Sequence, residues 1–301
     1  MKEKEQGSLG KPLLMFVISM LIFGTVALAV RNIGLPSSVI AMSRGIIGAL
    51  FLFAAMAAAK KRPDLTAIRK NLIPLIASGI SLGINWILLF EAYRYTSIAV
   101  ATLCYYLEPV LLILSSPFVF REKLTAPKLI CSAAALAGMV LVSGVFEKNG
   151  TASGDGKTGI LFGIGAAIFY CCVVTFTKKT DGLDPFDCTL VQLIVSAVVL
   201  LPYNILSGAF SGASLSVPTL LWLAVAGIVH TGIAYLLYFG AVCRLPAQTA
   251  AIFSYIDPAS AILISVIIGE SFSPLAAFGA LLILGSTLIY SIFTGKPKNR
   301  K

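Results

Sequence analysis

The chain has 301 residues, of which 58% are hydrophobic and 12% are charged, against about 45–50% and about 25% in soluble domains. This composition excludes an ordinary water-soluble fold. At about 20 residues per membrane-spanning helix plus short loops, the length is used up by about ten spans. The formal net charge of +10 comes from short basic clusters between apolar runs, so we expect a lipid bilayer and no nucleic acid as partner.

Ten apolar runs follow one another along the chain, each bounded by charge, Pro or Gly. Each is long enough, or nearly so, to cross the hydrocarbon core as a helix. The first five are 13–30, 36–59, 71–92, 96–118 and 125–146, and the second five are 158–177, 185–207, 217–240, 247–268 and 273–293. We predict an all-α integral membrane protein with a first repeat at 1–146 and a second repeat with a basic C-terminal tail at 158–301. The stretch 147–157 contains GTASGDGK, which is typical of a flexible linker, here expected on the extracytoplasmic side.

Basic residues indicate the orientation of these spans. Most of the 23 Lys and Arg fall in clusters at 2–11, 60–70, 121–128, 178–179 and 296–301. With ten spans, these clusters share one side, and the positive-inside rule makes that side cytoplasmic. We therefore predict that both termini lie in the cytoplasm, that the number of spans is even, and that the protein is a multi-pass protein of the plasma (cytoplasmic) membrane.

An internal repeat supports the same organisation. The segment FEAYRYTSIAVATLCYYLEP, from Phe90 to Pro109, aligns without gaps with FGAVCRLPAQTAAIFSYIDP, from Phe239 to Pro258. Because each half has five spans, the second half must enter the membrane from the opposite side. This predicts two inverted five-helix repeats, a plan in which transporters bind substrate near the midplane between the repeats.

Three stretches carry a resemblance to a known family. They are IFGTVALAV from Ile22, YYLEPVLLILSSPFVFREKLT from Tyr105 and SYIDPASAILISVIIGESFS from Ser254. The pattern resembles the EamA-type ten-helix transporters of the drug/metabolite transporter (DMT) superfamily, over almost the whole chain. The resemblance implies a metabolite exporter that acts by substrate exchange or on an ion gradient. Family members export amino acids, amines, nucleotide-related metabolites and other small compounds. The chain departs from the family at Glu108, where a small polar residue more often precedes the proline.

Two acids are expected inside the membrane. Glu108 precedes Pro109 in the fourth run, and Asp257 precedes Pro258 at the duplicated position of the ninth. A carboxylate at this depth is expensive and usually marks an ion, proton or substrate path. Each proline also frees a carbonyl one turn earlier, which opens the helix for polar contacts. The alternative is that the acids only hold neighbouring helices together.

Aromatic residues are expected around these acids. Tyr105 and Tyr106 lie beside Glu108, Tyr255 lies beside Asp257, and Trp86 matches Tyr235 in the repeat. Rings beside a carboxylate attract a cation, by about 2 kcal/mol or more per ring when desolvated. An amine or quaternary ammonium substrate would suit such a cavity, whereas simple packing is the alternative for each single ring.

Two basic side chains also fall inside apolar runs. Arg44 would pair with Glu108 or Asp257, hold a substrate carboxylate, or extend to the interface. His230, the only histidine, would relay protons or bond to a neighbouring helix.

Glu91 and Arg94 are expected to pair on one helical face. Small residues in two runs predict close helix packing or room for substrate; they are Ser78, Gly79, Gly83, Gly227, Thr231 and Ala234.

These features predict a secondary active transporter that exports or exchanges a small cationic or zwitterionic metabolite by alternating access. Glu108, Asp257 and His230 are the candidate proton-coupling residues, and an amino-acid exporter that uses Arg44 is the rival.

The chain has no HExxH, GxSxG, P-loop or helix-opening GxGxxG motif, so we expect no catalytic residue, metal or cofactor. An intramembrane enzyme on a lipid-linked substrate, a channel and a scaffold are the alternatives from other classes. We expect a monomer or a homodimer.

Overall fold

The computed structural model describes residues 10–96, 98–142, 156–211, 215–267 and 274–294, which contain helices and turns but no strand. The first half holds α1 (Gly10–Gly24), α2 (Val26–Val30), α3 (Ser37–Ala58), α4 (Leu65–Lys70), α5 (Leu72–Tyr95), α6 (Ile98–Tyr105), α7 (Glu108–Val119) and α8 (Ala126–Val142). The second half holds α9 (Gly156–Lys178), α10 (Pro185–Leu206), α11 (Val217–Gly227), the π-helix η1 (Ile228–Ile233), α12 (Ala234–Val242), α13 (Ala247–Ser254), α14 (Ile256–Ile267) and α15 (Pro274–Thr294). The predicted linker at 147–157 falls mostly outside the described residues, as does the basic tail.

Seven helices of the described part are long and apolar enough to cross a membrane. They are Gly10–Val30, Ser37–Ala58, Leu72–Tyr95, Val100–Val119, Gly156–Lys178, Pro185–Leu206 and Val217–Val242. Two apolar helices are shorter, Ala126–Leu141 and Ala277–Tyr290. The run expected at 247–268 is helical as α13 and α14. The chain is thus an all-helical, multi-pass membrane protein, and the count of ten spans stays a prediction.

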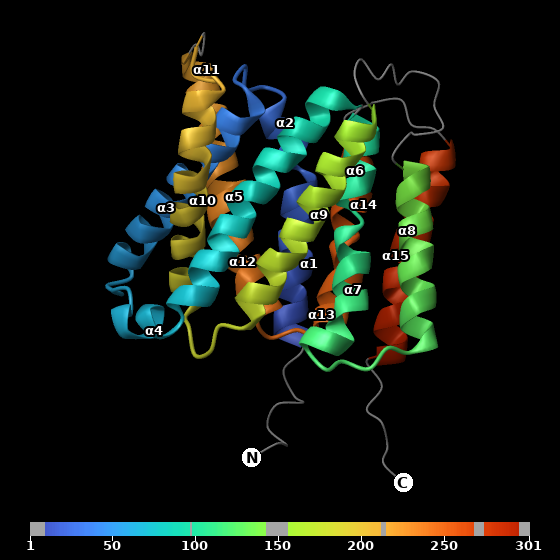
Figure 1. Ribbon diagram of the computed structural model, residues 1–301. Coiled ribbons are helices and arrows are strands. Elements are labelled where there is room, and N and C mark those ends of the chain that lie inside the picture. Colours follow the sequence, from blue (N-terminus) through green and yellow to red (C-terminus); the bar gives the residue numbers. More distant parts are fainter. Residues whose placement is uncertain (1–9, 97, 143–155, 212–214, 268–273, 295–301) are drawn as a thin grey trace.

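The two halves run in opposite directions through the bundle. The beginning of α1 and the end of α15 lie at the same end, whereas α9 begins at the other end and descends beside α5 (Figure 1). The shared end also carries α4 and the loops 120–125 and 179–184 (Figure 1). We call it the basic end, because exposed Lys and Arg gather there; they include Lys60, Lys61, Arg62, Arg69, Lys70, Arg121, Lys123 and Lys179.

The halves are interleaved rather than side by side. The most extensive helix packing joins α5 to α9 and α10, α3 to α10, α8 to α15, and α1 to α12 and α14. Exchanging each helix for its equivalent in the other half gives pairs that also pack: α5 on α9 corresponds to α12 on α1, α5 on α10 to α3 on α11 and η1, and α1 on α14 to α9 on α6 and α7. The packing therefore follows the pseudo-two-fold symmetry expected of inverted repeats.

Small residues make the close contacts of this interface. A Cβ added at Gly79 would lie 2.6 Å from the side chain of Val195, and one added at Gly83 would lie 2.7 Å from that of Val199. Only glycine lets α5 approach α10 so closely, which is how small residues act at helix interfaces in membranes. The prediction of close packing for this face is confirmed.

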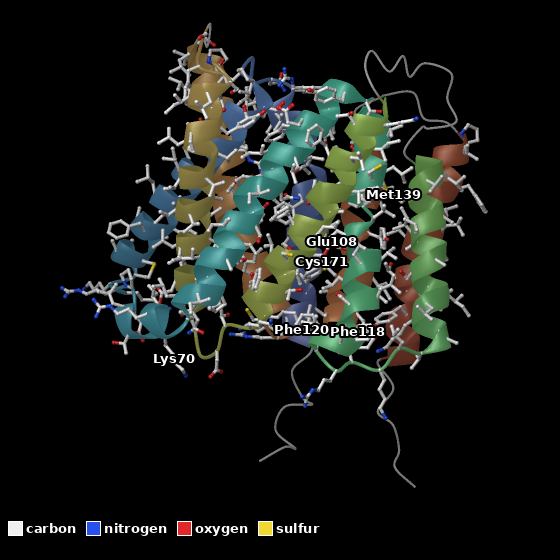
Figure 2. The ribbon with its side chains drawn as sticks, in the orientation of Figure 1. Lys70, Glu108, Phe118, Phe120, Met139 and Cys171 are labelled. Atoms are coloured by element: carbon white, nitrogen blue, oxygen red, sulfur yellow. The ribbon has the colours of Figure 1, made fainter. Side chains whose placement is uncertain are left out.

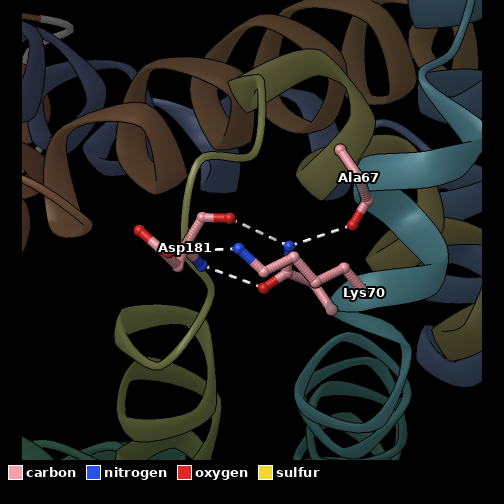
Figure 3. Close-up of polar contacts among 4 residues, drawn as sticks. Ala67, Lys70 and Asp181 are labelled. Atoms are coloured by element: carbon pink, nitrogen blue, oxygen red, sulfur yellow. Dashed lines mark hydrogen bonds and ion pairs between the residues drawn. The ribbon is translucent and has the colours of Figure 1, made fainter.

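Polar contacts join the halves at the basic end. The Asn71 side chain donates to the carbonyls of Ala67 (2.9 Å) and Asp181 (3.0 Å), and its Oδ1 accepts from the Asp181 N–H (2.9 Å) (Figure 3). Lys70 Nζ lies 3.4 Å from Asp181 Oδ2, but both side chains are mostly exposed, so this pair contributes little. The buried Asn71 amide is the firmer link between α4–α5 and the loop after α9.

Candidate functional site

Two helices break at equivalent positions. The α6–α7 segment is interrupted at Tyr106 and Leu107, just before Glu108 and Pro109, and the α13–α14 segment is interrupted at Tyr255, just before Asp257 and Pro258. Pro109 and Pro258 have no N–H group that could donate to a carbonyl of the preceding helical turn. The prolines thus explain both breaks, which place two acids at the openings of discontinuous helices as the sequence predicts.

Glu108 lies in the interior of the bundle. Figure 2 shows it about midway between the two ends, near Cys171 of α9. The side chain is 5% exposed, and it makes no hydrogen bond or ion pair with any residue that the structure describes. Its electrostatic neighbours are the hydroxyls of Tyr105, Tyr238 and Tyr255 and the thiol of Cys171. A buried carboxylate without a partner is costly, so this position is poorly explained by packing alone.

Asp257 has a direct partner in the other half. Its Oδ2 accepts a 3.0 Å hydrogen bond from the Tyr106 hydroxyl. Tyr106 also accepts at its backbone carbonyl, from the Tyr255 hydroxyl at 3.3 Å. Tyr106 therefore connects the two helix breaks through both its side chain and its main chain.

This arrangement corrects one expectation. The sequence suggests that Tyr106 flanks Glu108 and that Tyr255 flanks Asp257, whereas each tyrosine contacts the opposite break. Tyr106 binds Asp257, and Tyr255 is an electrostatic neighbour of Glu108. The physical reason is the symmetry: the axis brings the two breaks against each other, so each side chain reaches across it.

A row of aromatic rings runs through the interface between the halves. Neighbouring ring centroids lie 5.6 to 6.3 Å apart, within the range of favourable aromatic pairs. The row, in order, is Trp86, Tyr235, Tyr238, Tyr170, Tyr105 and Tyr106. Phe23 of α1 packs on its middle, 5.0 Å from Tyr235 and 6.0 Å from Tyr238. Both acids interact electrostatically with members of this row.

Arg44 lies in a second polar cluster. Its Nε donates a 3.0 Å hydrogen bond to Thr231 Oγ1, and it forms no ion pair with an acid in the described part of the chain. Of the three alternatives for Arg44, the ion pair with Glu108 or Asp257 is therefore not seen among the described residues. Tyr235 interacts electrostatically with both Arg44 and Asp257, so this cluster and the acids share it as a neighbour.

His230 belongs to the same cluster. Its Nε2 shares a 2.8 Å hydrogen bond with Thr25 Oγ1, at the break between α1 and α2. Its electrostatic neighbour is Arg44 rather than either acid. His230 and Thr231 lie in the π-helix η1, where Thr231 Oγ1 donates to the carbonyl of Ala226, five residues earlier. Single π turns inside α-helices occur frequently at functional sites.

Below the acids, the halves are tied together at the basic end. Glu122, between α7 and α8, accepts from the backbone N–H groups of Ala247 (2.6 Å) and Gln248 (3.1 Å) in the first turn of α13. The Gln248 amide donates to Ser116 Oγ at 2.6 Å. Lys178 of α9 donates to the carbonyls of Val242 and Leu245 at the end of α12. The contacts of Glu122 and Ser116 join the two halves, whereas those of Lys178 connect two helices of the second half.

The structure brings most of the predicted site residues together. Glu108, Tyr105, Trp86, Tyr235, Asp257 and Tyr255 share one region, and Arg44 and His230 form the adjoining cluster. The expected ion pair is present away from both, with Arg94 Nη1 2.9 Å from Glu91 Oε1. Among the described residues, no three His, Cys, Asp or Glu lie together as metal ligands would.

Sequence reasoning missed three members of the site. Tyr238 lies three residues after Tyr235 and so shares its helical face, which the sequence could have revealed. Tyr170 falls in IFYCCVVTF, which aligns with IFGTVALAV of the first apolar run. The residue aligned with Tyr170 is Gly24, so the repeat gave no pair of aromatic residues at this position. Thr25 carries no signal of its own, because its role depends on a helix break and on a partner 205 residues away.

Comparison with known proteins agrees with this architecture. A crystal structure superposes with a TM-score of 0.83 over 95% of this chain and 99% of the other, at 21% identity, a likeness that shows the fold alone. An uncharacterized transporter of Bacillus subtilis, YxxF, is 31% identical over 83% of this chain and 79% of its own length. An uncharacterized transporter of Archaeoglobus fulgidus is 26% identical over 91% and 93%.

The family assignment follows from the match over both repeats. The pattern of the EamA-like transporter family fits residues 10–144 and again residues 157–292. The resemblance seen in the sequence is thereby confirmed, and with it the two-repeat architecture. The chain belongs to the EamA-like transporter family.

Proposed function

We propose that this protein is a secondary active transporter that exports or exchanges a small cationic or zwitterionic metabolite. It works by alternating access around a midplane site between the repeats. The observation that carries the proposal is the pair of broken helices whose acids, Glu108 and Asp257, meet a row of aromatic rings between the halves. Discontinuous helices at a repeat interface are the usual place for substrate and coupling ions in such transporters.

The chemistry of the site favours a positive group on the substrate. A cation beside Glu108 would gain from the carboxylate and from the faces of Tyr105 and Tyr238, since both effects strengthen when water is excluded. Glu108 then binds proton and substrate in turn, because it has no other partner among the described residues. Asp257, already bound to Tyr106, assists. His230 faces Arg44 rather than the acids, which makes it the weaker candidate for proton transfer.

The topology of the proposal has ten spans, in repeats at 1–146 and 158–301. The basic end faces the cytoplasm, since positively charged loops stay on that side. Both termini are then cytoplasmic, and the linker at 147–157 is extracytoplasmic. The membrane is the cytoplasmic membrane, as in the relatives named inner membrane transporters, such as YhbE of Escherichia coli.

The arrangement of Arg44 favours amino-acid export as the second candidate. Tyr235 interacts with both Arg44 and Asp257, so one small zwitterion could place its carboxylate near Arg44 and its ammonium group near the acids. Among the described residues, Arg44 is bound through its Nε alone, by Thr231, which leaves its terminal N–H groups for such a carboxylate.

The test is transport by the purified protein in liposomes fused to supported membranes. Currents are recorded for monoamines, quaternary ammonium compounds and amino acids. Three variants are compared with the wild type: Glu108→Gln, Arg44→Gln and, as a control, Glu91→Gln. Glu91 is an acid at the end of α5 whose partners are Arg94 and Tyr203, so its change leaves the site intact.

We expect a saturable current that Glu108→Gln abolishes and Glu91→Gln preserves. If Glu108→Gln transports with unchanged pH dependence, the proton-coupled mechanism is wrong. A current for amino acids alone, lost in Arg44→Gln, would select the second candidate. Monoamine currents that survive in Arg44→Gln would keep the first.

A further inference from the structure

An apolar groove lies on the outer face of the bundle between α3 and α10. Its volume is about 380 Å³, and its floor is formed by the buried residues Met42, Ala49 and Ala197. The other side chains that line it are 43% to 64% exposed, namely Ile46, Leu50, Phe53, Ile194, Val198 and Leu201. Since these residues lie in two membrane spans, the groove opens to lipid rather than to water.

The length of the groove matches the hydrocarbon thickness of one leaflet. It extends along α3 from Met42 to Phe53, which is about 16 Å at about 1.5 Å per residue. Half of a hydrocarbon core of about 30 Å is similar. An acyl chain of one leaflet therefore matches the length and the chemistry of this surface.

A basic pocket continues the groove toward the basic end. Its volume is about 400 Å³, and Phe53 belongs to the walls of both hollows. The rest of the lining comes from the end of α3 and the loop after it, namely Met56, Ala57, Lys60, Lys61, Arg62 and Pro63. Three cations and no acid are therefore found among the described residues that line this pocket.

Backbone hydrogen bonds fix the conformation of the loop that carries these three cations. Lys60 has a φ of 54°, the left-handed conformation of a helix C-terminus. Its N–H bonds to the carbonyl of Ala57 (3.0 Å), while the N–H of Lys61 bonds to that of Met56 (2.9 Å), a Schellman motif. Lys61 Nζ lies 5.7 Å from the Phe186 ring centroid on α10, so the loop spans both helices.

Two acids lie beside the loop, and neither belongs to the pocket lining. The Asp64 side chain caps α4, where its Oδ1 accepts from the backbone N–H groups of Thr66 and Ala67, both at 3.0 Å. Asp187 is 2% exposed, and its Oδ2 accepts from the backbone N–H of Asp64 at 3.2 Å. Lys60, Lys61 and Arg62 remain exposed.

We propose that this joined surface is a binding site for an anionic phospholipid. One acyl chain lies in the groove between α3 and α10, and the phosphate of the headgroup binds in the basic pocket. Neither the groove nor the basic pocket alone would specify such a ligand. A free phosphate lacks the acyl chain, and a zwitterionic lipid lacks the net charge. Basic groups beside membrane spans attract anionic headgroups by a free energy that corresponds to about fivefold per Lys or Arg.

The test uses a tryptophan placed where the two hollows meet. Phe53→Trp is introduced after the two native tryptophans are replaced, as Trp86→Phe and Trp222→Phe. The protein is reconstituted with brominated phosphatidylglycerol or brominated phosphatidylcholine in a phosphatidylcholine background, and quenching gives the relative affinity of the two lipids. The same measurement is made with Lys61→Gln and Arg62→Gln together. The matched control is Arg121→Gln with Lys123→Gln, two exposed cations at the same end of the bundle.

We expect phosphatidylglycerol to be preferred by about fivefold or more, and this preference to fall by about fivefold or more in the Lys61 and Arg62 variant but not in the control. Equal quenching by both lipids in the parent protein would overturn the proposal, as would an equal loss in both pairs. Excess inorganic phosphate should leave the preference unchanged, and its abolition would indicate a free-anion site instead. All replaced cations are exposed, so each variant should elute as the parent does.

Discussion

The hydroxyl of Tyr106 lies 3.0 Å from Asp257 Oδ2, so a residue at the helix break of one repeat donates to the acid at the break of the other. The carbonyl of Tyr106 accepts from Tyr255 at the second break. A change in the relative position of the two repeats must break or lengthen these bonds. In the proposed alternating-access cycle, the movement of the repeats and the state of Asp257 would thereby be coupled through one side chain.

Removal of that hydroxyl tests the coupling. Tyr106→Phe keeps the ring contact with Tyr105 and removes a hydrogen bond to a carboxylate, which contributes about 1.5–3 kcal/mol. We expect the transport rate to fall by about tenfold or more, measured as initial uptake into liposomes. Tyr95→Phe is the control, because Tyr95 packs on Phe162 away from the acids. Wild-type rates in Tyr106→Phe would mean that Asp257 acts independently of the break.

The contact between Thr25 and His230 should contribute to stability. Thr25→Val keeps the side-chain shape but leaves His230 Nε2 without its partner, and its Nδ1 already lacks a well-aligned one in the described part of the chain. We expect a loss of about 1–3 kcal/mol in the free energy of unfolding. A double-mutant cycle with His230→Leu, measured by denaturation in detergent, should give a coupling of about 1 kcal/mol. Additive effects would show that the bond is not a stabilising contact.

Opening at the basic end should depend on Glu122. Glu122→Gln removes a negative charge from the N-terminus of α13 and one of the two acceptors for Ala247 and Gln248, an effect of about 0.3–1 kcal/mol. In a variant that keeps only Cys171 of the six cysteines, we expect labelling of this thiol from the basic side to become about two- to fivefold faster. Glu91→Gln, at the other end of α5, serves as the control and should leave the labelling rate unchanged. An unaltered rate in Glu122→Gln would show that the capping contacts do not limit access.

The approach of α5 to α10 should tolerate no added methyl group. Gly83→Ala places a Cβ 2.7 Å from the side chain of Val199 and 3.1 Å from the Ser196 carbonyl. We expect a destabilisation of about 1–3 kcal/mol, seen as a lower melting temperature in detergent. Gly285→Ala on α15 meets nothing within 4 Å and should be neutral or slightly stabilising. If both variants melt alike, the interface must relax more easily than its geometry indicates.

Much of the architecture could be predicted from the sequence, because burial in lipid leaves a long apolar run for each span. The duplication of Glu108-Pro and Asp257-Pro also predicted where two helices break. The partners of the tyrosines could not be predicted, since alignment shows that Tyr106 and Tyr255 are equivalent but not that each reaches across the axis. The π turn at His230 and the contact of Arg44 with Thr231 likewise depend on packing between α3 and η1, for which one sequence carries no signal.

The packing of helices from one half against helices of the other affects how the chain assembles in the membrane. Ser78 and Asn85 of α5 donate to the carbonyls of Val173 and Ala166 on α9, a helix that the ribosome has not yet produced when α5 enters the bilayer. The newly synthesised first half therefore holds polar side chains in lipid without their final acceptors. We therefore expect these contacts between α5 and α9 to form only after the second half is inserted.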